Sequence, residues 1–450
     1  MENANKVDVF CLFHGSPDIS PRNSGRVESG HVRTYVENSL RQVKERSGVP
    51  FVVRFAGGGV LDFAKGNPDF ALVFRNARAY RRIALFGHVG LLEAYFDGDI
   101  DIEGSLPRAL AAGMQGGMDQ PTRLVRWLNR WHEFLHTNAN RRQANRNAEF
   151  HYALTPEFYR LWLDDPYMFY TCAYWTDQTR TLEEAQRAKA DHVARKVLLQ
   201  PGDEVVDVGS GFGGFLMHAA QHYGVRITSI NTTGSQADHA RRQIERFGIR
   251  NAVQMHADFR AGDGQFDRLV SIGCLEHAGR DQLGEVIRSH AKLLKPGGIG
   301  LIHFIGHVGH HDTDFFIRKY VFPGGWIPSL ADAIIEMERA GLEVLDVENL
   351  RRHYALTLDA WAERFDRNWD RIQALDPKRF DERFRRIWRV YLYGCAEMFR
   401  SPTGLTHLFQ IVFSKGNVSR TSYPMTRDFL YADDGKSHQE ERRASRQAQG

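Results

Sequence analysis

A glycine-rich turn at residues 209–214 is the part of this 450-residue chain best suited to bind a cofactor. It follows the apolar run VVDV and opens onto a helix-like sequence, so it has the strand, turn and helix order of a nucleotide-type loop. Glycine lets the backbone approach a ligand closely, and open α/β sheets bind ligands beyond the carboxyl ends of their strands. Gly209, Gly211 and Gly214 also satisfy GxGxxG, a pattern that alone is a weak sign of a dinucleotide site.

The residues about twenty positions beyond this turn help to distinguish the cofactor classes, because a dinucleotide site needs an acidic residue there for the ribose. This chain carries the polar sequence TSINTT at residues 228–233 instead. Asp207, just before the turn, fits the first motif of class I methyltransferases, whose sulfonium cofactor has no pyrophosphate. The pattern favours S-adenosylmethionine, and a dinucleotide oxidoreductase stays the alternative.

The sheet that would carry this loop is indicated by alternating helix-like and strand-like segments from Glu183 onward, which is typical of a parallel α/β sheet. The expected strands are residues 204–209, 226–231, 252–257, 266–273 and 298–306, with residues 342–350 and 407–416 as edge strands. Long insertions after strand ends usually shape active sites. We therefore expect residues 307–330 and a long helical segment, residues 357–400, to cover the site.

The first part of the chain has a different pattern. Residues 50–104 combine short apolar runs with glycine-rich turns, which indicates a small α+β unit. Residues 119–147 predict an interdomain helix followed by a polar linker. The apolar positions of that helix are Leu124, Trp127, Leu128, Trp131 and Leu135. The expected domains are residues 1–118, 119–148 and 149–432, with a disordered tail at 433–450.

Composition restricts the class of protein. A chain of 450 residues favours two domains, and a net charge of +4 is too mild to indicate a nucleic-acid partner. Four scattered cysteines without a CxxC pair argue against structural zinc and against secretion. Neither a leader nor a long apolar stretch is present, so we expect a cytoplasmic protein that does not span a membrane. The basic clusters near residues 141–146, 351–352 and 383–389 are interpreted as solvated helix faces.

Around the glycine loop the sequence closely resembles the cyclopropane-fatty-acid synthases and the related mycolic acid cyclopropane synthases. The resemblance covers residues 149–416 and rests on a series of motifs in the family's order. Besides the loop, they are HYALTPEFYRLWLD, YTCAYW, TLEEAQRAK, FDRLVSIGCLEHAG, LIHFIG, YVFPGGWIPS and YLYGCAEMFR. The resemblance implies an α/β fold: a class I, Rossmann-like methyltransferase sheet with helical lipid-cap insertions, plus a small N-terminal α+β domain.

The resemblance also implies an activity and its residues. The activity is methyl transfer from S-adenosylmethionine to a cis double bond of a phospholipid acyl chain, followed by loss of a proton to bound bicarbonate and closure of a cyclopropane ring. The bicarbonate contacts implied are Cys172, Glu276, His303, the backbone at Ile305, and Tyr391, beside which Tyr393 is an alternative. The S-adenosylmethionine contacts implied are Tyr170, Thr171, Asp207, Gly209, Gly211, Asn231, Thr232, Gln236, Asp258 and Phe259.

The chain departs from the family's pattern inside the cofactor site. Ser210 and Phe212 stand where the family has cysteine and tryptophan, and residues 231–233 read Asn-Thr-Thr where it has Thr-Leu-Ser. These differences leave the fate of the carbocation open. Methyl transfer without ring closure, giving a methyl- or methylene-branched or furan-precursor chain, is the alternative within the class.

Aromatic faces can stabilise a carbocation without trapping it, so aromatic residues are expected at the site. The candidates are Phe169, Tyr170, Tyr174, Trp175, Phe316, Tyr320 and Trp326. The N-terminal domain is expected to make peripheral contact with membrane phospholipids, with Arg78, Arg81 and Arg82 facing phosphates. A simple dimerisation or folding module is the alternative interpretation of that domain, and a homodimer is a further expectation.

Simpler interpretations of the single residues stay open. Cys172 and His303 could be core residues, and Glu276 could cap the next helix. His303 with His307, His310 and His311 invites a metal site, but no carboxylate or cysteine spacing completes one, so no metal is expected. A non-catalytic lipid-binding protein is the alternative from another class.

Overall fold

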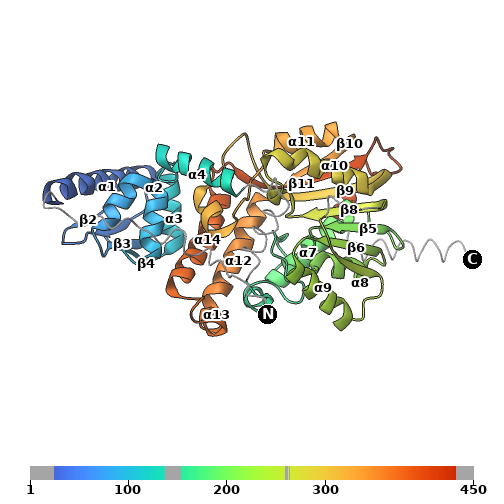
Figure 1. Cartoon of the computed structure of the whole chain (residues 1–450), viewed down its shortest axis with the longest axis horizontal. Helices are drawn as coiled ribbons and strands as arrows, with labels where there is room; N and C mark the ends of the chain where they lie inside the picture. The colour runs from blue at the N-terminus through green and yellow to red at the C-terminus, as the bar shows by residue number, and fades with distance from the viewer. Residues whose placement is uncertain (1–24, 137–153, 259–261, 263, 432–450) are drawn as a thin grey trace, which may run out of the picture.

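Two β-sheets organise the chain. The computed structural model describes residues 25–136, 154–258, 262 and 264–431. The N-terminal sheet, in the order β2-β1-β3-β4, lies at one end of the molecule, and a seven-stranded sheet lies at the other (Figure 1). Two helices that connect β10 to β11 of the larger sheet, α12 and α14, fill the space between the two sheets.

The N-terminal unit has the α+β composition that its sequence predicts. Its strands are β1 (Phe51–Arg54), β2 (Val60–Asp62), β3 (Phe70–Phe74) and β4 (Ile100–Gly104), and its helices are α1 (Gly25–Ser47), α2 (Arg78–Phe96) and α3 (Leu106–Gln115). Every residue of β3 is buried, and the Phe70 ring stacks on that of Phe51 with 5.0 Å between centroids. α4 (Arg123–Leu135) then leads toward the second unit.

The larger sheet has the order β10-β11-β9-β8-β5-β6-β7. Strands β5 (Glu204–Val208), β6 (Arg226–Asn231), β7 (Ala252–His256), β8 (Phe266–Ile272) and β9 (Leu294–His307) are parallel. Strands β10 (Leu342–Asn349) and β11 (Thr406–Lys415) are antiparallel to their neighbours. The prediction of two edge strands is wrong for β11, which lies between β10 and β9. Eight of its ten residues are buried, as expected for a strand paired on both sides, whereas β10 is mostly half-buried.

Helices cover both faces of this sheet, because successive apolar side chains of β5 point to opposite faces and both must be buried. Val206 packs with α10 (Leu283–Leu293) and α11 (Leu330–Arg339), whereas Val205 packs with α7 (Leu182–Lys196) and α8 (Gly214–His222). α9 (Gly234–Arg246) follows β6. The sheet and its helices therefore form the expected Rossmann-like class I architecture.

The helical segment expected at residues 357–400 consists of three helices, α12 (Arg351–Arg367), α13 (Trp369–Leu375) and α14 (Glu382–Arg400). α12 and α14 enclose an aromatic core with the segment before α7; its largest fully buried rings include Trp162 and Trp361. α6 (Pro156–Arg160) belongs to that segment, and α15 (Asp428–Tyr431) ends the described chain.

The arginines of α14 join the two units, which corrects their interpretation as a solvated face. Arg383 contacts Asp97 at 3.0 Å, and Arg386 contacts Asp101 at 2.8 Å. Both carboxylates belong to the N-terminal unit, and their pKa values lie below the ordinary range because arginine hydrogen bonds outweigh burial. The cluster is an ion-paired interface between units.

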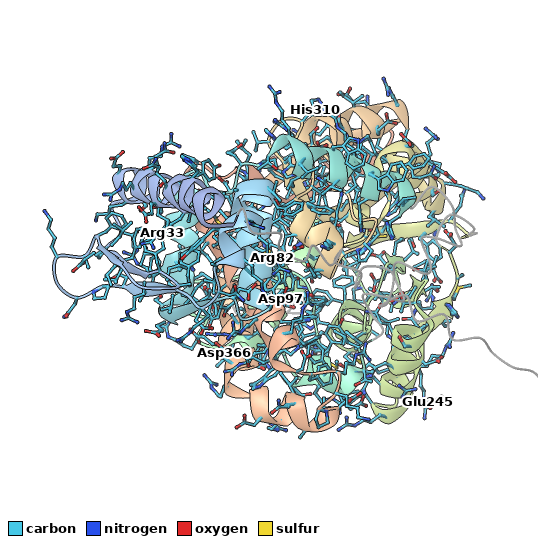
Figure 2. The ribbon with its side chains drawn as sticks, turned by 60° about the vertical axis from the view of Figure 1, so that its left-hand side comes forward. Arg33, Arg82, Asp97, Glu245, His310 and Asp366 are labelled. Atoms are coloured by element: carbon cyan, nitrogen blue, oxygen red, sulfur yellow. The ribbon has the colours of Figure 1, made fainter. Side chains whose placement is uncertain are left out.

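The arginines of α2 are also engaged. Arg78 contacts Asp99 at 2.6 Å, and Arg82 contacts Asp97 at 2.7 Å. Figure 2 labels Arg82 and Asp97. The side chains of Arg78 and Arg82 are paired with carboxylates, although that of Arg78 is 61% exposed, and Arg81 is exposed as well. Within the described residues, no helix combines the length and the apolar character needed to cross a bilayer.

Candidate active site

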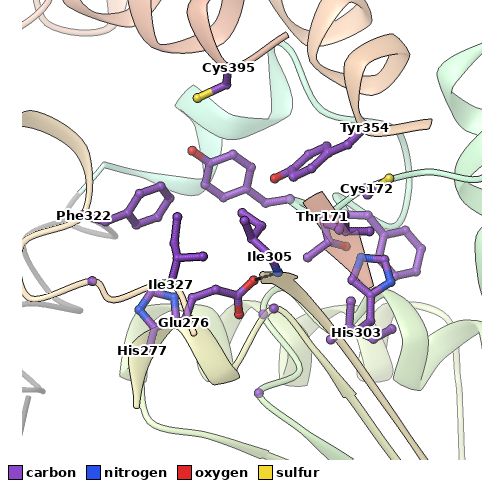
Figure 3. Close-up of a pocket in the computed structure, with 18 of the residues that line it drawn as sticks. Thr171, Cys172, Glu276, His277, His303, Ile305, Phe322, Ile327, Tyr354 and Cys395 are labelled. Carbon is purple, nitrogen blue, oxygen red and sulfur yellow. Dashed lines mark hydrogen bonds between the residues drawn. The ribbon is translucent and has the colours of Figure 1, made fainter. Parts of the chain in front are cut away.

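A cavity of about 160 Å³ lies at the carboxyl ends of β5, β8 and β9. The glycine loop and the segment Phe169–Cys172 form one side, and residues of α12 and α14 close the other. Figure 3 shows Glu276, His303 and Ile305 at the sheet end of the cavity, with Cys395 at the far, helical end. Of the predicted site residues, Cys172, Glu276, His303, Ile305, Tyr391, Tyr170, Thr171, Asp207, Gly209, Gly211 and Gln236 line it.

The glycine loop is shaped by close approaches and by backbone conformation. Gly209 has φ +79°, and a Cβ there would lie 3.0 Å from the Cβ of Cys274. A Cβ at Gly214 would lie 2.8 Å from the carbonyl oxygen of Tyr167. Gly211, with φ +53°, has no protein atom within 4 Å of its Cβ position and lines the cavity. The open side of the loop is therefore available to a ligand.

Asn231 orders this loop from behind. Its Nδ2 donates to the carbonyl oxygen of Gly211 at 2.9 Å and to Oε1 of Gln236 at 3.2 Å. Its Oδ1 accepts the N–H of Thr233 at 2.9 Å. Asn231 and Thr232 do not line the cavity, and Gln236 does. The end of β6 thus carries an amide that is bonded within the protein, where a dinucleotide site has an acid for the ribose.

The other predicted cofactor residues occupy different surroundings. Asp207 is buried next to β6 and accepts the hydroxyl of Ser229 at 3.0 Å, and burial raises its pKa to about 7. Asp258 belongs to the part of the chain that the structure describes, but it does not line the cavity. Phe259 lies outside the described residues.

Glu276 is a buried carboxyl with one free oxygen. Its Oε1 accepts the N–H of Ile305 at 2.7 Å, and among the described residues its Oε2 has no hydrogen-bond partner. Burial raises its pKa to about 7 despite the Ile305 N–H, which favours the ionised form. A carboxyl in this state can exchange a proton near neutral pH.

His303 places a second free polar atom in the cavity. Pairing of β8 with β9 sets it opposite Ile272, where β8 ends. The amide of Gln410 meets its Nδ1 at 3.1 Å, and with that amide as donor the proton lies on Nε2. Nε2 has no partner among the described residues, and burial lowers the pKa well below the ordinary range, which keeps the ring neutral. Nε2–H of His303 can therefore donate a hydrogen bond to a ligand, and Oε2 of Glu276 can accept one.

Cys172 and two tyrosines border this pair. Burial raises the pKa of Cys172, so its sulfur is a thiol, and Sγ donates to the carbonyl oxygen of Ala173 at 3.2 Å. The hydroxyls of Tyr391 and Tyr170 are 2.8 Å apart. Tyr393 instead donates to Asp366 at 3.1 Å. Between the two tyrosines considered from sequence, the structure places Tyr391 in the cavity.

The predicted aromatic residues divide into two groups. Phe169, Tyr170 and Trp326 line the cavity, whereas the other four do not. Tyr174 stacks on His192 and His353, and Trp175 donates its indole N–H to Thr357. Phe316 and Tyr320 pack against Phe96 of the N-terminal unit. The aromatic lining instead includes Phe212, Phe215, Phe322, Tyr354 and Phe399.

Two of the residues at the site were missed from sequence. Tyr354 shares one face of α12 with Leu358 and Trp361, a spacing that could have identified it. Lys189 on α7 donates to Oγ1 of Thr171 at 3.0 Å and lies 3.3 Å from the Phe169 ring centre. It is completely buried, and burial lowers its pKa. Lys189 ends the motif TLEEAQRAK, but its place in a highly charged helix predicted an exposed side chain.

The histidine cluster does not converge on one point. His307 is hydrogen-bonded to Thr406, Nδ1 of His310 lies 3.3 Å from a carboxylate oxygen of Asp332, and His303 faces Gln410. Within residues 25–136, 154–258, 262 and 264–431, no group of three or more His, Cys, Asp or Glu side chains is arranged so that it could hold a metal ion.

Comparison with known proteins agrees with this architecture. The family model for mycolic acid cyclopropane synthetase matches residues 139–411. Cyclopropane-fatty-acyl-phospholipid synthase of Escherichia coli K12 is 32% identical over 80% of this chain and 89% of its own length. Tuberculostearic acid methyltransferase UfaA1 of Mycobacterium tuberculosis H37Rv is 31% identical over 78% of this chain and 85% of its own.

A solved structure extends the comparison. Mycolic acid cyclopropane synthase CmaA1, described in complex with SAH and CTAB, superposes with a TM-score of 0.56 at 33% identity, over 60% of this chain and 98% of that one. The sheet, the glycine loop and these likenesses define an S-adenosylmethionine-dependent methyltransferase of class I. The chain belongs to the mycolic acid cyclopropane synthetase family.

The two neighbouring tyrosines give a matched test of the site. Tyr391→Phe should lower turnover by about tenfold, the change that corresponds to ~1.4 kcal/mol, because it removes a hydroxyl from the cavity. Tyr393→Phe should leave turnover unchanged and lower the free energy of unfolding by about 1.5 kcal/mol, because it removes the hydrogen bond to Asp366. Methyl-transfer rates and urea denaturation of both variants measure this. Equal losses of turnover would exclude a special role for Tyr391.

Proposed function

We propose that this chain methylates the cis double bond of an unsaturated phospholipid acyl chain and closes a cyclopropane ring there. One observation carries the proposal: an aromatic and aliphatic cavity holds two buried, unpartnered polar atoms, Oε2 of Glu276 and Nε2 of His303. Buried polar atoms without partners are rare and need an explanation. An apolar substrate accounts for the aromatic and aliphatic lining, and the proton that it must lose accounts for the two polar atoms.

The lining suits a carbocation. An alkene is a weak nucleophile, so it has to be aligned with the sulfonium methyl in a site that excludes water. The faces of Tyr354, Phe322 and Phe212 can stabilise positive charge. Burial keeps the Cys172 thiol and the Tyr354 hydroxyl protonated by raising their pKa values. No strong anionic nucleophile is therefore presented by these groups to trap the cation.

The unpartnered atoms fit a small oxyanion with its own proton, which is the property of bicarbonate. Nε2–H of His303 would donate to such an anion, and Oε2 of Glu276 would accept its hydroxyl, with Cys172 and Tyr391 beside them. Bound bicarbonate would supply the weak base for the proton that the substrate loses. The N–H of Ile305 is bonded to Glu276, so in this chain it orients the carboxyl.

The relatives support an acyl acceptor and also define the main alternative. The Escherichia coli relative is named as a synthase of cyclopropane fatty-acyl phospholipids, and the UfaA1 relative as a tuberculostearic acid methyltransferase. The second name favours methyl transfer without ring closure as the alternative. A non-catalytic lipid-binding role is disfavoured because Glu276 and His303 present unpartnered atoms and the glycine loop is open.

Product analysis with S-adenosylmethionine carrying a deuterated methyl group separates these outcomes. Ring closure leaves two of the three deuteriums in the product, in ring positions identifiable by NMR. A methyl branch retains all three deuteriums, and a methylene branch gives the mass of the ring but an olefinic NMR signal. Ring resonances support the proposal, and a branched product would replace it with the alternative.

Turnover should depend on pH through Glu276. Because burial raises its pKa to about 7, the carboxylate is lost as the pH falls through that value, and turnover should fall with it. His303 should add no limb near neutrality, since burial keeps it neutral. Rates measured under saturating substrate between mildly acidic and mildly basic pH test this. A flat profile through pH 7 would show that proton exchange at Glu276 is not needed.

A further inference from the structure

The outward face of α4 exposes a row of large apolar side chains. Trp127, Trp131 and Phe134 are 61%, 53% and 73% exposed, with Leu124 and Leu135 beside them. The Trp127 and Trp131 rings stack 6.1 Å apart, and the Phe134 ring lies 6.2 Å from that of Trp131. We call these five residues the aromatic face of α4. A contiguous exposed apolar face of this kind marks an interaction site.

The inner face of the same helix is fixed to the wall of the cavity. Asn129 donates to the carbonyl oxygen of Thr313 at 2.9 Å. The fully buried Arg318 donates to Asn129 at 3.1 Å, to Glu133 at 3.0 Å and to the carbonyl oxygen of Gly325 at 3.1 Å. Thr313 and Gly325 line the cavity. Whatever binds the aromatic face is therefore held next to the site.

A row of arginines runs along this face. Arg123, Arg126 and Arg130 are exposed and recur at spacings of three and four, beside the aromatic residues. Among the residues that the structure describes, none of the three has an acidic partner. Glu133, the carboxylate of α4, is turned inward to Arg318. The face is thus both aromatic and cationic.

We propose that α4 docks this chain onto an anionic phospholipid bilayer, its aromatic face entering the headgroup region and its arginines meeting phosphates. The inference rests on the proposed function, because a phospholipid substrate resides in a bilayer. Tryptophan suits the membrane interface, and arginine is attracted to anionic headgroups. In Figure 1, α4 lies at one edge of the molecule, over the junction of the two units.

Charge favours a lipid surface over a second copy of the chain. A two-fold contact would bring the same patch together twice, and with it both arginine rows. No outward carboxylate of α4 offsets them. Because Arg78 and Arg82 are paired with carboxylates and Arg81 is exposed, α2 presents less uncompensated positive charge than α4 does.

Flotation with vesicles of equal parts phosphatidylglycerol and phosphatidylcholine tests the proposal. The triple variant Trp127→Ser, Trp131→Ser and Phe134→Ser should bind about tenfold or more weakly, while its affinity for S-adenosylhomocysteine and its melting temperature stay unchanged. A control triple variant carries serine at three exposed apolar positions elsewhere. These are Val60, Ile335 and Met425, and vesicle binding should be unaffected.

The arginine row is tested separately. Arg123→Gln, Arg126→Gln and Arg130→Gln together should weaken binding to the anionic vesicles about tenfold and flatten its salt dependence. Unchanged vesicle binding by the aromatic variant would overturn the proposal. If that variant also changed from a dimer to a monomer, the aromatic face would be a contact between two copies of the chain instead. If the wild-type chain methylates no acyl chain even in detergent micelles, the proposed function fails, while flotation still decides the role of α4.

Discussion

Replacing Glu276 with glutamine should slow methyl transfer to an unsaturated phospholipid by about hundredfold or more, the usual contribution of a positioned acid–base group. The amide cannot carry the charge that Oε2 offers, but its carbonyl oxygen can still accept the Ile305 N–H, which meets Oε1 at 2.7 Å in the wild-type chain. Initial rates at saturating substrate, followed by mass spectrometry of the lipid, measure the loss. The shape of the site should be preserved.

Stability of this variant provides the control for folding. Burial raises the pKa of Glu276 above its unfolded value, so its favourable effect on folding is present at low pH and lost as the pH rises through about 7. Above that pH, Glu276→Gln should be at least as stable as the wild type. Glu285→Gln on α10, outside the cavity lining, should leave the rate unchanged. A near wild-type rate for Glu276→Gln would contradict its assigned role.

Replacing Gly211 with valine should weaken binding of S-adenosylhomocysteine by about tenfold or more. A β-branched residue at φ +53° is strained, and its side chain would enter the cavity because no protein atom lies within 4 Å of the Cβ position. The strain is shared by the free and bound states and lowers stability, whereas the loss of affinity comes from obstruction of the ligand, and ~1.4 kcal/mol of obstruction corresponds to a factor of ten. Isothermal titration calorimetry measures the affinity.

A second glycine separates strain from obstruction. Gly202 has φ +92° and no protein atom within 4 Å of its Cβ position, and it does not line the cavity. Gly202→Val should therefore lower stability without changing the affinity for S-adenosylhomocysteine. If both variants lost affinity equally, the loop would not be the binding surface. Unchanged affinity in Gly211→Val would exclude it as well.

The sheet was predictable because its strands are buried and regularly spaced. β5, β6, β8 and β9 lie where their apolar runs predict, and the glycine turn follows β5. The place of β11 inside the sheet was not, since a run of buried residues does not reveal which strands flank it. The helical segment at residues 357–400 was predicted, but its division into α12, α13 and α14 was not.

The candidate site was predictable only in part because its residues come from distant parts of the chain. Motif order identified Cys172, Glu276, His303 and Tyr391, and the fold brings all four to one cavity. Periodicity could not show that Asn231 supports the loop from behind. Residue type alone could not show that Arg78 and Arg386 serve ion pairs. Such roles depend on tertiary contacts.

The acceptor can be identified by incubating the purified chain with methyl-labelled S-adenosylmethionine and phosphatidylglycerol vesicles, whose acyl chains are either cis-monounsaturated or saturated and of equal length. We expect label in the acyl chains of the unsaturated lipid alone, with a mass gain of one methylene group that keeps two of the three hydrogens of the transferred methyl. Label in the headgroup, or equal labelling of saturated chains, would contradict it. So would unlabelled lipid from a preparation that methylates a soluble amine.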